Sequence, residues 1–125
     1  MIWTYAAIGL FGAFGCWARF AQTNLVQATL GRDFPYATLS INLIGSFVMG
    51  FLFVETLERL TLSPALRAGI LTGFLGGYTT FSTFEMETLL LAEAGEGLKA
   101  ILYVILSVGL GFVAAFGGAY IARSL

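Results

Sequence analysis

The stretch Thr72–Glu87, TGFLGGYTTFSTFEME, places two adjacent glycines, a run of hydroxyl side chains and two spaced phenylalanines inside a strongly apolar part of the chain. Adjacent glycines followed by two β-branched threonines disfavour the interior of an α-helix. In a soluble protein such a stretch would be an ordinary loop. Its meaning therefore depends on the segments that surround it.

Those segments are apolar and free of charge. Hydrophobic residues make up 58% of the 125 residues and charged residues only 10%, against about 25% in a soluble domain, and the mean hydropathy is +0.90. Asp, Glu, Lys and Arg are absent from residues 1–18, 34–54, 68–84 and 100–122. Each window has about the 20-residue length that a helix needs to cross a bilayer, and none has the polar stripe of a soluble bundle helix. The sequence therefore predicts an all-α membrane protein with four transmembrane helices.

The predicted spans are separated by short joints that contain proline or glycine. We place the spans at about 3–23, 37–56, 66–92 and 98–122. Residues 1–125 then form a single four-span transmembrane domain. The first apolar run has no Lys or Arg before it and no small-residue cleavage site after it, so we do not expect a signal peptide.

Composition excludes several other classes of protein. One cysteine and no histidine leave no internal disulfide and disfavour a transition-metal site. A net charge of −1 without a basic cluster argues against nucleic acid as a partner. No nucleophile–base pair or metal constellation supports an enzyme.

Charge predicts the orientation of the spans poorly. With four spans, both termini and the middle joint share one side of the membrane. The two sides hold three basic residues each: Arg59, Arg67 and Arg123 on one, and Arg19, Arg32 and Lys99 on the other. Basic residues normally mark the cytoplasmic side, so this tie predicts insertion in both orientations unless one arginine or the amino terminus decides. Two opposed copies would form an antiparallel dual-topology homodimer about a twofold axis in the membrane plane.

The glycine pair predicts a broken third helix. Gly76 and Gly77 follow Arg67 by nine and ten residues, which is roughly 14 Å along a helix and about half of the hydrocarbon core. A break at that depth exposes carbonyl oxygens that only protein, water or an ion can satisfy. Carbonyls at the end of a half-helix hold cations in transporters. We expect a cation cage at the dimer axis, or alternatively a kink that serves only helix packing.

Polar groups inside the spans favour a small anion as the transported species. Phe81 and Phe84 share one helix face, and the positive edges of their rings can favour an anion. Four further polar side chains lie within the spans: Thr38, Asn42, Tyr103 and Ser107. Taken alone, each of these residues is better explained by contacts between helices than by binding of a ligand. Together they offer the contacts that an anion needs in hydrocarbon, where isolated charges are very costly.

Three motifs carry a resemblance over the whole chain: GAFGCWARF in the first span, TLSINLIGS in the second and TGFLGGYTTFSTFEME in the third. The chain resembles the Fluc (CrcB-type) fluoride channels, and GG-T-TFSTF with an upstream NL-G is the most specific part. The resemblance implies an antiparallel homodimer in the inner cell membrane, with two passive fluoride-selective pores that export fluoride. It also implies a central structural sodium ion. The implied partners are the fluoride ion, a second copy of the chain and the lipid bilayer.

The resemblance also implies residue roles. The rings of Phe81 and Phe84 would line the fluoride path, and Asn42 would reach it. Main-chain carbonyls of Gly76 and Thr79 from each subunit would hold the sodium ion. The remaining implied pore positions are Thr38, Ser82, Thr83, Tyr103 and Ser107, and the implied vestibule residues are Arg19 and Glu87.

The chain departs from the family pattern at two positions. Glu85 stands directly after TFSTF, where relatives often have a small residue, and Gly111 stands where some relatives have a hydroxyl. The main alternative is a dual-topology multidrug exporter, which would be expected to carry a glutamate in the first span; residues 1–18 have none. A membrane scaffold subunit would explain the glycines but not a midspan break followed by spaced aromatic rings.

Overall fold

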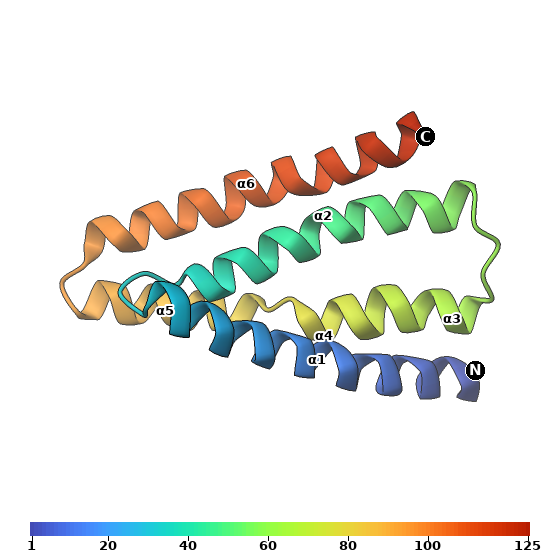
Figure 1. Cartoon of the computed structure of the whole chain (residues 1–125), viewed down its shortest axis with the longest axis horizontal. Helices are drawn as coiled ribbons and strands as arrows, with labels where there is room; N and C mark the ends of the chain where they lie inside the picture. Colours follow the sequence, from blue (N-terminus) through green and yellow to red (C-terminus); the bar gives the residue numbers. More distant parts are fainter.

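The computed structural model describes residues 1–125 and is entirely helical, without strands (Figure 1). Four rods follow one another along the chain, and the third is interrupted. The first, second and fourth rods are α1 (Ile2–Leu30), α2 (Tyr36–Glu58) and α6 (Gly97–Ser124). The third consists of α3 (Pro64–Ala68), a π-helical segment η1 (Gly69–Leu75), α4 (Gly76–Tyr78) and α5 (Phe81–Glu93). The predicted all-α fold with a broken third helix is confirmed.

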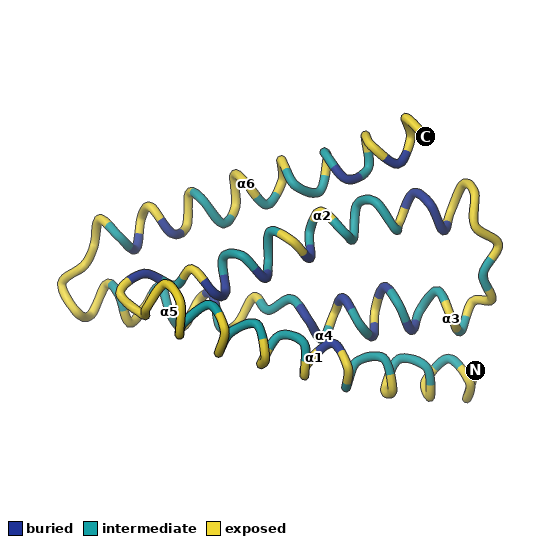
Figure 2. Tube along the Cα trace, in the orientation of Figure 1, coloured by how far each residue is buried: buried dark blue, intermediate teal, exposed yellow.

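Both termini and the α2–α3 joint lie at one end of the bundle, and the α1–α2 and α5–α6 joints lie at the other (Figure 1). α2 packs along α6, and α1 packs along η1 and α4. Only 19 residues are buried, and most of α6 is exposed (Figure 2). Two helices, α2 and α6, are long and apolar enough to cross a membrane, with mean hydropathies of 1.9 and 2.3. An extensive exposed apolar surface is expected on helices that lipid or another chain covers.

α1 is longer than the sequence suggests. It continues to Leu30, whereas we predicted an end at residue 23. The helix stops only at Gly31, whose φ of 79° is accessible mainly to glycine. Arg19 therefore lies inside the helix rather than near its end. The basic residues at the two ends of the bundle then number three against two, so the predicted tie becomes a near balance.

The break lies later than the glycine pair. Gly76 and Gly77 are helical, and the helix stops after Tyr78. The extended residues are Thr79, with φ −82° and ψ 158°, and Thr80, with φ −151° and ψ 121°. β-branched residues favour this backbone region. The Thr80 hydroxyl also accepts the Thr83 N–H at 3.3 Å and so caps α5.

Gly77 allows close helix packing and does not interrupt the helix. A Cβ atom at Gly77 would lie 2.6 Å from the carbonyl oxygen of Gly12 in α1. This separation is too short for any side chain, so glycine is required for α1 and α4 to approach this closely. A break had been predicted from the poor helix propensity of the glycines, and the close approach of α1 explains why the helix continues through them.

Gly118 allows α6 to pack directly on α2, and replacing it is expected to destabilise the fold. A Cβ atom there would lie 2.1 Å from the carbonyl oxygen of Phe47. We expect Gly118→Ala to lower the free energy of unfolding by about 1–3 kcal/mol, because the two helices must move apart. The adjacent control is Gly117→Ala, since no atom lies within 4 Å of a Cβ at Gly117. Thermal unfolding in detergent, followed by circular dichroism, measures both; equal midpoints would contradict the packing explanation.

Candidate functional site

Asn42 on α2 stabilises the extended backbone at the break through two hydrogen bonds. Its side-chain Nδ2 donates to the carbonyl oxygen of Thr80 at 2.9 Å, and its Oδ1 accepts the N–H of Thr80, also at 2.9 Å. One side chain thus satisfies both main-chain polar groups of an extended residue that has no helical partners. A carboxamide has two N–H groups, so Asn42 keeps one donor that these bonds do not use.

α1 holds the same segment at two further points. The Nε of Arg19 donates to the carbonyl oxygen of Gly77 at 3.0 Å. The hydroxyl of Tyr78 donates to Oε1 of Gln22, and Nε2 of Gln22 donates to the hydroxyl of Ser40 at 3.1 Å. Side chains of α1 and α2 therefore fix three of the four residues from 77 to 80.

The carbonyl oxygens of Gly76 and Thr79 remain without these partners. The N–H of Thr79 still makes a helical bond, to Leu75, but the N–H of Thr80, which a continuing helix would direct to the Gly76 carbonyl, donates to Asn42 instead. No hydrogen bond reaches the Thr79 carbonyl. Unpaired carbonyls of this kind need a partner when they are taken out of water. An all-oxygen donor set suits a hard cation such as sodium.

A cavity of about 360 Å³ lies beside the break, between α2, α5 and α6. It brings together four of the predicted pore residues: Asn42, Phe81, Phe84 and Ser107. The hydroxyl oxygen of Ser107 is buried and has no hydrogen-bond partner. The rings of Phe81 and Phe84 lie 5.7 Å apart and are tilted by 57°. The cavity thus offers a free hydroxyl, one unused amide N–H and two aromatic rings.

The two phenylalanines differ sharply in burial. Phe84 is 8% exposed and packs in a cluster with Phe34 and Tyr103. Phe81 is 69% exposed. A large aromatic ring in a membrane protein is expected to be covered by lipid or by another chain. The side of the cavity formed by Phe81 is therefore incomplete within one chain.

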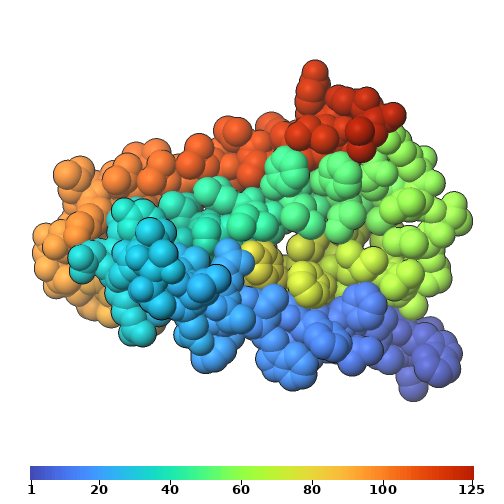
Figure 3. All heavy atoms as spheres, in the orientation of Figure 1, coloured from blue at the N-terminus to red at the C-terminus, as the bar shows by residue number.

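A further cavity of about 660 Å³ separates α2 from η1, where the space-filling view shows the molecule hollowed (Figure 3). Gly76 lines it, as does Arg67. The Nε of Arg67 donates to the hydroxyl of Thr56 at 2.9 Å, and its guanidinium lies 4.9 Å from the ring centre of Phe53. One face of the break thus opens to this hollow, while Thr79 lines the cavity beside Phe81.

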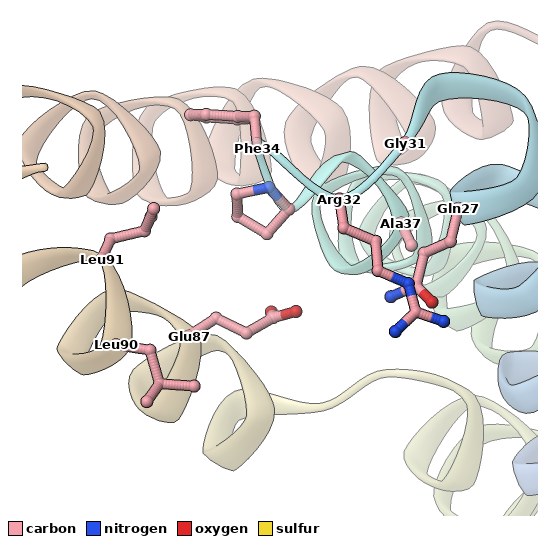
Figure 4. Close-up of a pocket in the computed structure, with 9 residues that line it drawn as sticks. Gln27, Gly31, Arg32, Phe34, Ala37, Glu87, Leu90 and Leu91 are labelled. Carbon is pink, nitrogen blue, oxygen red and sulfur yellow. The ribbon is translucent and has the colours of Figure 1, made fainter. Parts of the chain in front are cut away.

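Tyr103 links the buried phenylalanine to Glu87. Tyr103 is 0% exposed, and its ring meets Phe84 in a T-shaped contact with centres 5.1 Å apart. Its hydroxyl donates to Oε1 of Glu87 at 2.8 Å. Glu87 lines a third cavity of about 260 Å³ at the end of the bundle that holds the α1–α2 and α5–α6 joints, together with Gln27 and Arg32 (Figure 4).

The other predicted site residues lie outside the two cavities at Phe84 and Glu87. Thr38 is buried, Ser82 is exposed, and the Thr83 hydroxyl accepts from Thr80 at 3.0 Å. Arg19 is bonded to Gly77, so the structure does not bring the two predicted vestibule residues, Arg19 and Glu87, together. Of the departures from the family pattern, Glu85 is exposed and lines neither cavity.

Sequence reasoning missed two groups of residues. Gln27 and Arg32 share the cavity of Glu87, and Gln22 supports Tyr78. The position of Arg32 in the joint after α1 was visible in the sequence, but its proximity to Glu87 was not. The polar side chains of Gln22 and Gln27 show that the second half of α1 carries polar groups, but they lie five residues apart and so do not share one helix face.

The interrupted helix presents unpaired carbonyl oxygens beside a cavity lined by hydroxyl, amide and phenyl groups. This architecture is typical of a membrane transport protein. Comparison with known families makes the class definite. The chain belongs to the family described as CrcB-like protein, Camphor Resistance (CrcB), which matches residues 6–119. This is a family of ion channels, so the chain is a membrane protein and not an enzyme.

Three relatives share the name fluoride-specific ion channel FluC. The protein of Acidithiobacillus ferrooxidans is 59% identical over 124 residues, which cover 99% of each chain. That of Geobacter sulfurreducens is 46% identical over 122 residues and 98% of each chain. That of Methylococcus capsulatus is 55% identical over 119 residues, which are 95% of this chain and 52% of the longer relative.

Proposed function

We propose that this chain is a passive, fluoride-selective ion channel that lets fluoride leave the cytoplasm across the inner cell membrane. The observation that carries the proposal is the cavity beside the break, which assembles Asn42, Phe81, Phe84 and Ser107. Relatives that match nearly the full chain are named as fluoride-specific channels, which supports fluoride as the ion.

The proposed mechanism exchanges water around fluoride for weak protein contacts. The unused N–H of Asn42 and the unpartnered hydroxyl of Ser107 can donate to the ion. The ring edges of Phe81 and Phe84 carry partial positive charge. Several weak sites in a row replace hydration without trapping the ion, which conduction requires. No step needs energy input, so fluoride moves down its own gradient.

A second copy in the opposite orientation would complete the pathway. In one chain Phe81 is 69% exposed and Gly76 opens to a hollow. Two copies related by a twofold axis in the membrane plane would cover both surfaces. The near balance of basic residues between the two ends is consistent with insertion in both directions. We propose an antiparallel dual-topology homodimer with two pores.

The break fits a structural sodium ion at the axis of that dimer. The carbonyl oxygens of Gly76 and Thr79 would hold it, two from each copy, because they lack the hydrogen-bond partners of a continuous helix. Bound there, sodium supplies a fixed positive charge that satisfies four carbonyl dipoles. It is a structural ion and is not transported.

Removing sodium is expected to destabilise the dimer. Replacing sodium by N-methylglucamine leaves the four carbonyls unpaired, and sodium at 100 times its dissociation constant would contribute about 2.7 kcal/mol to stability. Unfolding temperatures of the purified dimer in sodium, potassium and N-methylglucamine chlorides measure the effect. An identical midpoint in all three salts would contradict the sodium site.

Anion release from liposomes tests the function. Purified protein is reconstituted into vesicles loaded with potassium fluoride and potassium chloride, and valinomycin starts the release by carrying potassium. A fluoride electrode and a chloride electrode then follow the two anions. We expect rapid fluoride release with negligible chloride release. A folded protein that releases no fluoride would contradict the proposal. Drug–proton exchange, the activity of the alternative class, would then be measured. That alternative expects a glutamate in the first span, whereas the charged residue inside α1 is Arg19.

A further inference from the structure

The cavity at the end with the α1–α2 and α5–α6 joints is lined by two opposite charges, Arg32 and Glu87, that do not form an ion pair. Figure 4 shows the carboxylate of Glu87 extending from α5 and the guanidinium of Arg32 extending from the α1–α2 joint, both toward the same space. The side chain of Gln27 lines the same space. The three ion pairs of the chain involve other residues. An open space of about 260 Å³ therefore has a cation on one wall and an anion on another.

Glu87 is fixed in place by its contact with the interior. Its Oε1 accepts the hydroxyl of Tyr103 at 2.8 Å, and Tyr103 is fully buried against Phe84. The carboxylate is thus tied to the phenylalanine that lines the cavity beside the break. Arg32, in contrast, is exposed in a short joint and its side chain makes no hydrogen bond. The guanidinium is free to face an ion that arrives from water.

We propose that Arg32, with Gln27, forms an anion-admitting site at the mouth of the fluoride path, where its charge offsets that of Glu87. This inference rests on the proposed function. A carboxylate alone at the mouth would repel fluoride. The guanidinium cancels that repulsion and offers five N–H donors, and the amide of Gln27 adds two more. The ligand is a small hydrated anion that stays partly hydrated at this site.

The arrangement makes a specific electrostatic prediction. A charge at a channel mouth raises the local concentration of the opposite ion, and salt weakens this effect. Removing Arg32 leaves Glu87 unopposed, so fluoride should arrive more slowly at low ionic strength. Removing both charges should restore the rate, because the walls of the cavity then carry no charge. A purely structural role of Arg32 would give neither the salt dependence nor the restoration.

The test uses four full-length proteins in liposomes: the unchanged chain, Arg32→Gln, Glu87→Gln and the double variant. Glutamine at 87 keeps an oxygen that can accept from Tyr103. Initial fluoride release is measured at about 10 mM and about 1 M ionic strength, where the screening lengths are about 30 Å and 3 Å. Lys99→Gln serves as the matched control, because Lys99 lies at the same end, pairs with Glu96 at 3.8 Å and does not line the cavity.

We expect Arg32→Gln to slow release about threefold at low ionic strength, to have no effect at high ionic strength, and to be relieved by Glu87→Gln. Equal rates for Arg32→Gln and the unchanged chain at low ionic strength would overturn the inference while leaving the channel proposal intact. So would a slowing that persists at high ionic strength and in the double variant. Absence of fluoride release from the unchanged chain would instead overturn the proposed function, and this inference with it.

Discussion

Replacing Asn42 by alanine is expected to lower fluoride release by about 100-fold or more, because one side chain performs two tasks. It satisfies both the N–H and the carbonyl of Thr80, and it lines the cavity beside the break with one N–H that these bonds do not use. Leaving a buried main-chain group unsatisfied costs about 1–3 kcal/mol, and the two partly buried groups of Thr80 would each lose part of that amount. The chain can recover part of this by letting the Thr80 N–H return to the Gly76 carbonyl.

That rearrangement would convert the break into continuous helix and remove one of the proposed sodium ligands. Asn42→Ala should therefore lose both conduction and the dependence of stability on sodium, as measured by liposome release and by unfolding in sodium and N-methylglucamine salts. Asn24→Ala is the matched control, since Asn24 is an exposed asparagine on α1. Full release by Asn42→Ala, with an unchanged sodium dependence, would contradict the role assigned to this residue.

Replacing Phe81 by isoleucine is expected to abolish fluoride release while leaving the fold of each chain intact. Phe81 is 69% exposed and its only close aromatic neighbour is Phe84, at 5.7 Å. Isoleucine has similar bulk and hydrophobicity but no ring edge, so it removes the partial positive charge that favours an anion. The cost of placing an anion in an apolar setting is large, and we expect a loss of about 100-fold or more.

The matched control for this prediction is Phe116→Ile on α6. Phe116 is 71% exposed and belongs to a pair with Phe112, whose ring centre lies 6.1 Å away, but it does not line the cavity beside the break. Release rates of the two variants are compared after their elution volumes and unfolding temperatures are shown to match those of the unchanged chain. Equal loss in both variants would mean that the rings serve packing or lipid contact.

The broken rod could be predicted from the sequence, but its position could not. Local propensity marked Gly76 and Gly77 as the weakest helix residues, whereas the break lies at Thr79 and Thr80. The reason is a long-range contact: Gly77 lies against the backbone of Gly12, which a propensity argument does not see. We placed the end of α1 too early because polar residues follow position 21, although residues 22–30 contain neither glycine nor proline.

The site shows the same division. The spacing of Phe81 and Phe84 and the position of Asn42 placed these residues near the break, and the structure puts all three around one cavity. The separation of Arg19 from Glu87 could not be foreseen, because it depends on which turn of α1 faces α4. The cavity shared by Arg32 and Glu87 likewise arises from the packing of the first joint against α5.

Current through a planar bilayer under a fluoride gradient tests the central claim most directly. With a tenfold fluoride gradient, equal chloride on both sides and equal pH, a passive fluoride channel should give zero net current at about 59 mV, the equilibrium potential of fluoride. Replacing all fluoride by chloride should abolish the current. A reversal potential near zero, a current carried by chloride, or no current from correctly folded protein would contradict a fluoride-selective channel.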